Sequence, residues 1–440
     1  MSARKTRAAE RAAAPRTKAG AEIREHRLRN GLRVLLVERH LDPVVAVMVW
    51  YGVGSRDERE HEAGASHFLE HMMFKGTRAV GKGEVDRLTT ELGGSNNAFT
   101  TSDHTAYWFE LASDRWEAAL EIEADRMRGL LLDPAEFEAE KAVILEELAM
   151  GLDDPWRNLS MQVQEMLFPR HPYRRPVIGY RDVLEALAPE DLRDYYRRFY
   201  HPANATLVIC GDIGSAAALR AVRKHFGGIA AGPTETRRRA APAGSVIEEP
   251  RGERRIQTSW DDAGKRLCLA WPTIAVSEPE DFVLDVLSAI LSTGRLSRLH
   301  RRLVLERSLA TSMGTNNDTR VDGGSFWLFA ECAPDVEPEA LERAIDAELA
   351  ELAAKLPAAK ELKRAKATLA SSEAYEGETV SDLAESLGAW AVDAHWHLAL
   401  EAAERRNAVS AKDVRDAARR FLRSDRRVVG WSLPRTGAQS

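Results

Sequence analysis

Residues 191–199 read DLRDYYRRF and residues 413–421 read DVRDAARRF, so six of the nine positions are identical at a constant offset. Both copies have the pattern of an amphipathic helix, and each leads into an apolar strand, predicted over 205–210 and 427–432. A similarity that recurs at a fixed offset is typical of an internal duplication. We therefore predict two homologous halves that end in the same way.

Composition suggests where these halves begin and end. Residues 1–21 are rich in Ala, Arg and Lys and predict a disordered tail. The first half then covers 22–226, and the second covers 251–434, with a short tail at 435–440. Residues 227–250 contain several Gly and Pro residues and an Arg triplet, a composition typical of a linker.

The first half shows the alternation of strands and helices expected of a mixed α/β domain. Residues 22–29 and 32–38 predict a hairpin, in which Asn30-Gly31 would supply both positive-φ positions of a type I′ turn. Residues 44–51 are apolar almost throughout, which favours a central strand. Further strands are expected at 96–101, 105–111 and 205–211, and helices at 64–74, 83–92, 114–128, 134–151 and 157–167.

The motif that carries chemistry is HFLEH at residues 67–71. On a helix, His67 and His71 lie one turn apart on one face, with Glu70 beside them. Two neutral imidazoles at this spacing can bind one Zn²⁺, which then needs a third protein ligand and keeps an open position for water. A neighbouring carboxylate can take a proton from that water, so Glu70 is the predicted general base. The order H-x-x-E-H is that of the inverzincins, and we expect one Zn²⁺ per chain.

The third metal ligand is not fixed by spacing alone. The predicted helix at 134–151 carries five carboxylates, namely Glu136, Glu138, Glu140, Glu146 and Glu147. Glu140 and Glu147 are seven residues apart and therefore share a face of the helix. Any of the five could supply the missing ligand on this evidence.

The composition also excludes several functions. The formal net charge of the 440 residues is −6, so the chain lacks the basic footprint of a nucleic-acid-binding protein. No run approaches about 18 consecutive apolar residues, so we expect no membrane span. The first twenty residues lack an apolar h-region, so we expect a cytoplasmic protein in preference to an exported one.

The motif HFLEH, followed at 140–147 by E-x-x-V-I-x-x-E, resembles the pitrilysin family of zinc peptidases, which includes insulin-degrading enzyme and the mitochondrial processing peptidase. The resemblance extends over nearly the whole chain. The resemblance implies that His67, His71 and Glu147 are the zinc ligands and that Glu70 is the base. It also implies that Glu140 is a carboxylate that orients a ligand histidine. Whether Glu146 takes the place of Glu147 stays open.

Residues 96–100, NNAFT, are also similar to the substrate-binding edge strand of this family. By that resemblance, Asn97, Ala98 and Phe99 would bind peptide substrates by strand addition, a mode that reads the backbone of the peptide. The family also implies the fold: two homologous α/β (α+β) domains, each a largely antiparallel sheet with helices packed on one face, enclosing a peptide-binding chamber.

One departure from the family pattern concerns the second half. There the family pattern S-R-L-x-x-x-L-R-x-x-x-G-L-A-Y supplies an Arg and a Tyr that hold the substrate carbonyl. This chain reads SRLHRRLVLERSLAT at 297–311, so Val304 replaces the Arg and Thr311 replaces the Tyr. Losing an oxyanion donor costs about 10² to 10³ in rate. We therefore expect a homologous second chain to supply this pair in a heterodimer. The alternative is a homodimer in which a neighbouring arginine substitutes: Arg301, Arg302 or Arg307.

The sequence thus predicts a zinc-dependent endopeptidase subunit that hydrolyses unfolded peptides or presequences. The alternative is a non-catalytic scaffold or assembly subunit derived from the same family. The complete set of predicted ligands with an adjacent base favours the peptidase, because a scaffold has no use for a zinc site.

Overall fold

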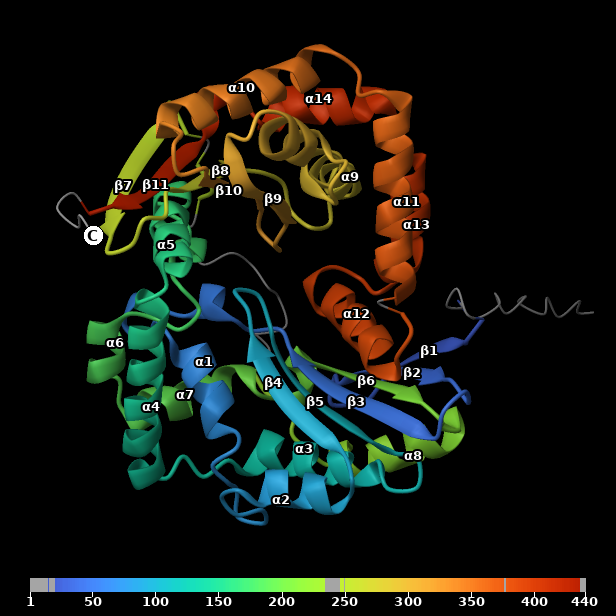
Figure 1. Ribbon diagram of the computed structural model, residues 1–440. Coiled ribbons are helices and arrows are strands. Elements are labelled where there is room, and N and C mark those ends of the chain that lie inside the picture. The colour runs from blue at the N-terminus through green and yellow to red at the C-terminus, as the bar shows by residue number, and fades with distance from the viewer. Residues whose placement is uncertain (1–14, 16–19, 234–245, 249, 376, 436–440) are drawn as a thin grey trace, which may run out of the picture.

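The computed structural model describes residue 15 and residues 20–233, 246–248, 250–375 and 377–435 (Figure 1). Most of the predicted N-terminal tail, the middle of the predicted linker with its Arg triplet, and residues 436–440 of the predicted C-terminal tail lie outside these described residues. No helix in the described part of the chain is long and apolar enough to cross a membrane.

Each half of the chain builds one β-sheet. The strands of the first half are β1 (Ile23–Arg27), β2 (Arg33–Glu38), β3 (Val44–Tyr51), β4 (Ser95–Thr100), β5 (Thr105–Ala112) and β6 (Ala205–Gly211). Those of the second half are β7 (Arg254–Trp260), β8 (Arg266–Pro272), β9 (Ala310–Asp318), β10 (Ser325–Cys332) and β11 (Val428–Pro434).

The two sheets have matching strand orders. The first runs β1-β2-β6-β3-β5-β4 and the second runs β7-β11-β8-β10-β9. Each contains a single parallel pair, β2 with β6 and β7 with β11, and its other neighbours are antiparallel. The predicted fold, two largely antiparallel sheets in an α/β protein, is therefore confirmed.

The helices of the first half are α1 (Ala65–Met72), α2 (Glu84–Glu91), α3 (Glu117–Gly129), α4 (Pro134–Leu152), α5 (Pro155–Leu167), α6 (Arg181–Ala186), α7 (Pro189–Phe199) and α8 (Ser215–Phe226). Those of the second half are α9 (Asp281–Ser292), α10 (Pro338–Ala354), α11 (Ala359–Tyr375), α12 (Val380–Asp393), α13 (His397–Ala408) and α14 (Ala411–Phe421). The two copies of the repeated sequence lie on α7 and α14, which lead into the matching strands β6 and β11.

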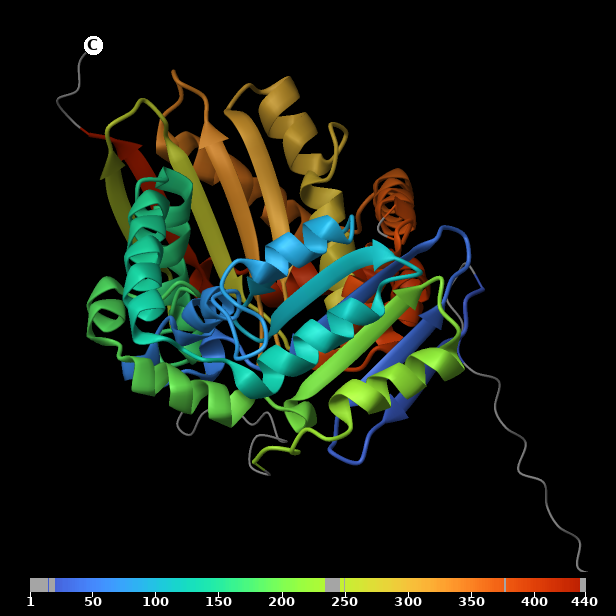
Figure 2. The same cartoon turned by 90° about the horizontal axis from the view of Figure 1, so that it is seen from below.

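Each sheet has helices of its own half on one face, as predicted. In the first half, α1, α3, α4, α7 and α8 share a core with the sheet, and Figure 2 shows α3 and α8 across its near side. The opposite face is covered by a helix from the other half. The second-half helix α12 packs on the first sheet, and the first-half helix α5 packs on the second sheet.

Because α12 and α5 each cover a sheet of the other half, the first sheet is buried on both faces, which explains why β3 is apolar along its whole length. Its alternate residues Val45, Val47 and Val49 join the core beneath α1 and α3. Met48 and Trp50 point to the other face and join the core that α12 contributes. A strand that is buried on both faces needs apolar residues at every position.

The predicted type I′ turn between β1 and β2 is wrong. Arg27 pairs with Arg33, so the loop has five residues, and of the Asn30-Gly31 pair only Gly31 has a positive φ, of 94°. The buried amide of Asn30 instead donates to the carbonyls of Phe226 and Ile229, at 2.8 and 3.0 Å. Asn30 therefore ties this loop to the end of α8.

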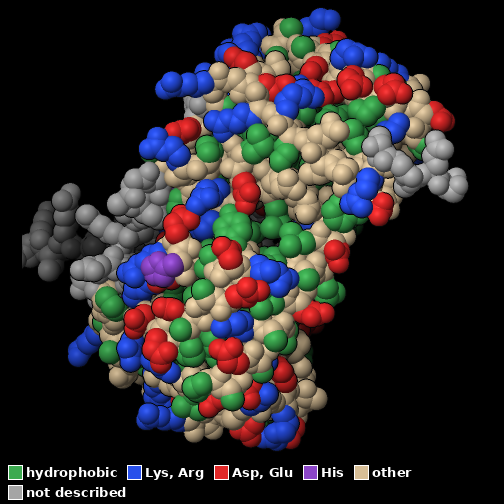
Figure 3. Space-filling model, turned by 90° about the vertical axis from the view of Figure 1, so that its left-hand side faces the viewer, with side chains coloured by type: hydrophobic (Ala, Val, Ile, Leu, Met, Phe, Trp, Pro, Cys, Tyr) green, Lys and Arg blue, Asp and Glu red, His purple; other side chains and the backbone are tan. Residues whose placement is uncertain are grey.

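Charged side chains of both signs are intermixed on the face of the molecule that Figure 3 shows. This face presents no continuous basic surface, in agreement with the net charge of the chain.

Candidate metal centre

The helix that carries the HFLEH motif begins at a closely packed glycine. Gly64 precedes α1 with a φ of +100°, and a Cβ atom there would lie 2.7 Å from the carbonyl oxygen of Ile178. The buried carboxyl group of Glu58 accepts hydrogen bonds from the backbone N–H groups of Gly64 and Ser66, at 2.9 and 2.8 Å. These contacts satisfy donors that a helix start leaves free and fix the position of α1. Burial raises the pKa of Glu58 to about 8.

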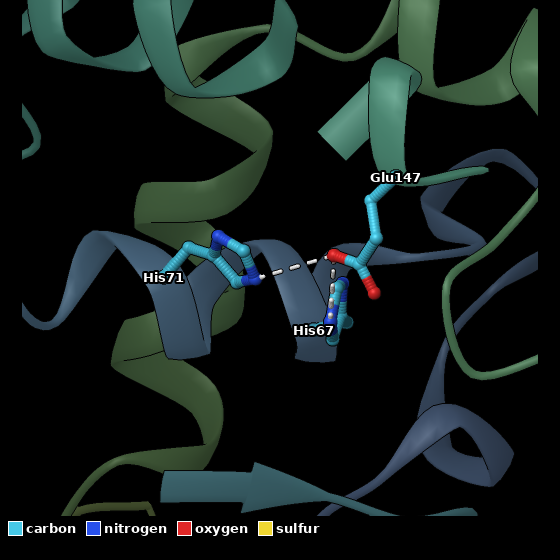
Figure 4. A group of neighbouring side chains, drawn as sticks. All are labelled: His67, His71 and Glu147. Carbon is cyan, nitrogen blue, oxygen red and sulfur yellow. Dashed lines mark ion pairs between the residues drawn. The ribbon is translucent and has the colours of Figure 1, made fainter. Parts of the chain in front are cut away.

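Three side chains from two helices converge in front of α1 (Figure 4). The Nε2 atoms of His67 and His71 each lie 3.7 Å from Oε2 of Glu147, which projects from α4. One ligand atom from each of the three residues can be chosen so that all lie within 4.8 Å of one another. Glu146, the other candidate, is exposed on α4.

The geometry of these three residues fits a zinc ion. Tetrahedral Zn²⁺ with ligand distances near 2.0 to 2.1 Å places its ligand atoms about 3.3 Å apart, slightly closer than the 3.7 Å separations found here. Two imidazole nitrogens and one carboxylate oxygen form the His₂Glu set of catalytic zinc sites. The side chain of Glu147 is 40% exposed, so the site is open on one side.

The protonation state of His67 also suits a ligand. Burial, the neighbouring His71 and the positive charge of Arg157 together lower the pKa of His67 to about 4. The imidazole is therefore neutral at neutral pH, as metal binding requires.

A chain of two contacts orients His71. Its Nδ1 atom lies 2.8 Å from Oε1 of Glu140, which leaves Nε2 free to face the other ligands. The second oxygen of Glu140 forms an ion pair with Nζ of Lys75 at 2.5 Å. Burial opposes ionisation of Glu140, but the hydrogen bonds from Lys75 and His71 outweigh it and lower its pKa. Sequence reasoning missed Lys75, because its contact with Glu140 joins two elements that are distant along the chain.

Glu70, the predicted base, lies beside the two histidines on α1. Burial raises its pKa, which favours a group that must accept and return a proton. Thr100 of β4 donates a short hydrogen bond to Oε2 of Glu70. Sequence reasoning missed Thr100 as well, because this contact joins two elements that are distant along the chain.

The predicted substrate-binding residues lie on β4, which is the edge of the first sheet. Asn97 is exposed, and its side chain accepts a hydrogen bond from the backbone N–H of Ala98 at 2.9 Å. Within the described residues, β4 pairs only with β5, so its outer edge is open to another strand. Phe99 points to the face of the sheet that α12 covers and packs edge-on against Trp50, with ring centroids 5.5 Å apart. Phe99 thus supports the strand instead of facing α1.

In the second half, Val304 and Thr311 occupy the two positions at which the family pattern has an Arg and a Tyr. Val304 packs against the second core from a π-helical turn at His300–Glu306. Thr311 is exposed near the start of β9. Among the neighbouring arginines, Arg302 forms 2.5 Å ion pairs with both Glu348 and Glu351, which hold it on the side of α10.

Two family models match the chain. The model described as Insulinase (Peptidase family M16) matches residues 33–180, which contain the candidate metal centre. The model described as Peptidase M16 inactive domain matches residues 186–369. The second match therefore begins after the HFLEH motif and all three candidate ligands, and it covers most of the half that lacks them.

The curated relatives include bacterial zinc proteases. The chain is 33% identical over 309 residues to an uncharacterized zinc protease of Mycobacterium leprae, covering 70% of this chain and 68% of the relative. It is 30% identical over 330 residues to the zinc protease PqqE of Helicobacter pylori, covering 74% and 73%.

Solved structures agree over nearly the whole chain. A protease from Helicobacter pylori matches with a TM-score of 0.89 and 26% identity, covering 94% of this chain and all of that one. A peptidase M16 inactive domain from Pseudomonas fluorescens shares the fold, with a TM-score of 0.85 at 18% identity, covering 95% and 99%. The sequence and structural matches together show that the chain belongs to the peptidase M16 family, the family of insulinase.

Proposed function

We propose that this chain is the zinc-bearing subunit of an endopeptidase that hydrolyses peptide bonds in unfolded peptides. The observation that carries the proposal is the placement of Glu70 beside a convergent His₂Glu set that fits zinc. The names of the bacterial relatives support it, since these are called zinc proteases.

The roles of the residues follow from their positions. Zn²⁺ held by His67, His71 and Glu147 would lower the pKa of a bound water and polarise a substrate carbonyl. Glu70 is placed to accept a proton from the attacking water and to return it to the leaving amine. Thr100 fixes one oxygen of Glu70, which leaves the other for proton transfer.

Substrate binding would use the open edge of β4. A peptide that adds to this edge as another strand would replace the side chain of Asn97 at the N–H of Ala98. Strand addition requires an extended peptide, so an unfolded chain is a better substrate than a folded protein.

A second, homologous chain would complete the active site. The side chain of Val304 has no hydrogen-bond donor and packs against the second core, and Arg302 is already held by two carboxylates. A partner that carries the Arg and Tyr of the family pattern would restore the missing donors, worth about 10² to 10³ in rate.

The test combines metal analysis with peptide cleavage. We expect the purified chain to contain about one Zn²⁺, as a single His₂Glu site requires. It should cleave a quenched fluorescent peptide slowly until the homologous chain is added. Glu70→Gln should keep the zinc and lower cleavage by about 10²- to 10⁴-fold.

Each part of the proposal has its own contrary result. Absence of stoichiometric zinc would reject the metal centre and favour a scaffold subunit. Zinc without cleavage in the presence of the partner would reject the peptidase. Full activity of the isolated chain would reject the need for a second chain.

A further inference from the structure

Arg157 lies in the first turn of α5, just after the helix that carries Glu147. The two helices are joined by Asp153 and Asp154, so α5 begins close to the end of α4. The carboxylate of Asp154 accepts a hydrogen bond from the backbone N–H of Arg157 at 2.6 Å, which caps α5. The side chain of Arg157 is exposed and turns back towards α4.

The guanidinium of Arg157 rests on Gly151. A Cβ atom at Gly151 would lie 2.7 Å from Cζ and 2.8 Å from Nε and Nη1 of Arg157, so no other residue fits there without displacing this group. Glycine is a poor helix former, yet Gly151 occupies the last turn of α4. Gly151 follows Glu147 by four residues, so the two share a face and lie about 6 Å apart along the helix axis. The guanidinium is thereby placed one turn beyond the ligand carboxylate.

The positive charge of Arg157 is uncompensated by ion pairs. Among the residues that the structure describes, no carboxylate lies within 4.0 Å of its guanidinium. Lys75, the other cation near the site, is bound to Glu140. Arg157 is therefore a cation that rests on Gly151, one helical turn beyond the candidate ligand Glu147, and is free to bind an anionic group.

We propose that Arg157 is a specificity-determining residue that binds a carboxylate of the substrate next to the scissile bond. This inference rests on the proposed peptidase function. The planar guanidinium presents several N–H donors that match a carboxylate, and such charge-assisted pairs are among the stronger hydrogen bonds. The carboxylate can come from an Asp or Glu side chain of the peptide or from its free C-terminus.

Binding to an inactive full-length protein tests this inference without requiring turnover. Zinc-loaded Glu70→Gln protein is titrated with fluorescent peptides that differ at one position, Glu or Gln, and have amidated C-termini. A further peptide has the neutral sequence and a free C-terminus, which separates the two sources of the carboxylate. We expect the Glu peptide to bind about tenfold more tightly than the Gln peptide.

Two variants in the same background should remove this preference. Arg157→Gln removes the positive charge, whereas Gly151→Ala keeps the charge and displaces the guanidinium. Both variants should therefore bind the Glu and Gln peptides with a ratio of affinities of about 1. The matched control is Arg181→Gln on α6, where the arginine is exposed and lies 3.6 Å from Glu185. This control should keep the tenfold preference, and zinc content should be equal in all variants.

Three results would overturn the inference. Equal affinities for the Glu peptide, the Gln peptide and the neutral peptide with a free C-terminus would show that no carboxylate is selected. An unchanged preference in Arg157→Gln would assign the selection to another group. An equal loss of affinity for all peptides would assign Arg157 a role independent of substrate charge. A fourth result, failure of every peptide to bind the zinc-loaded protein even with the homologous chain added, would reject the proposed function as well, which distinguishes the two failures.

Discussion

Replacing Lys75 with methionine should weaken zinc binding by about tenfold without unfolding the protein. Lys75 acts on the candidate ligands through Glu140, with which it forms an ion pair. It lies 2.5 Å from one oxygen of Glu140, whose other oxygen lies 2.8 Å from Nδ1 of His71. Without Lys75, the carboxylate loses the contact that fixes its second oxygen, and His71 loses part of its orientation.

The expected loss of zinc affinity follows from the number of contacts between Lys75 and the candidate ligands and from the burial of the Lys75–Glu140 pair. Partners that hold a ligand histidine typically change metal affinity by about 10- to 100-fold when removed. Lys75 acts one contact further out than Glu140, which places its effect at the lower limit, about 1.4 kcal/mol. The side chains of Lys75 and Glu140 are 25% and 8% exposed, so solvent screens this pair only in part.

The assay is competition for zinc with a chromogenic chelator, and the chain offers a matched control. Lys82 forms a 2.6 Å ion pair with Glu136, one turn before Glu140 on α4, but this pair touches no candidate ligand. Lys82→Met should therefore bind zinc like the wild type. Equal zinc affinities of Lys75→Met and Lys82→Met would refute the reasoning.

Two further predictions concern the groups that support α1. Glu58 has its pKa raised to about 8 by burial, so the folded protein holds a proton that the unfolded chain releases at lower pH. The free energy of unfolding of the wild type, measured in urea, should therefore fall relative to that of Glu58→Gln by about 1 kcal/mol or more as the pH rises from about 5 to 8. A difference between the two proteins that does not change with pH would contradict this. Thr100→Val should lower kcat about tenfold at unchanged zinc content, because Glu70 loses its hydrogen bond, whereas Thr100→Ser should restore it. An equal loss in Thr100→Ser would show that the hydroxyl is not what matters.

The residues of the candidate metal centre were largely predictable because they lie close together in sequence or on one helix. His67, Glu70 and His71 occupy a single turn of α1, and helical spacing alone places them on one side. The choice of Glu147 as third candidate came from the family pattern, since five carboxylates of α4 were equivalent by spacing. In the structure, Glu147 faces the histidines and Glu146 is exposed.

Contacts between distant elements were not predictable in the same way. Thr100 meets Glu70 only because β4 lies beside α1, and no local pattern specifies that neighbour. The helical pattern of residues 157–167 predicted α5, but a hydrophobic face does not reveal which sheet it will cover. Asn30-Gly31 misled because its sequence is typical of a tight turn, whereas Asn30 is used to bind the end of α8.

The exchange of α5 and α12 means that the two repeats are not separable folding units. Trp50 of β3 packs against Gly388 of α12, where a Cβ atom would lie 2.1 Å from its Nε1. Val163 of α5 packs against Gly430 of β11, where a Cβ atom would lie 2.5 Å from its Cγ2. A polypeptide cut between Phe226 and Arg254 would yield two fragments. Each fragment would expose one apolar face of its own sheet and would carry the helix that covers the sheet of the other fragment. Such fragments would be complementary: insoluble when made singly, and able to reconstitute one particle when made together.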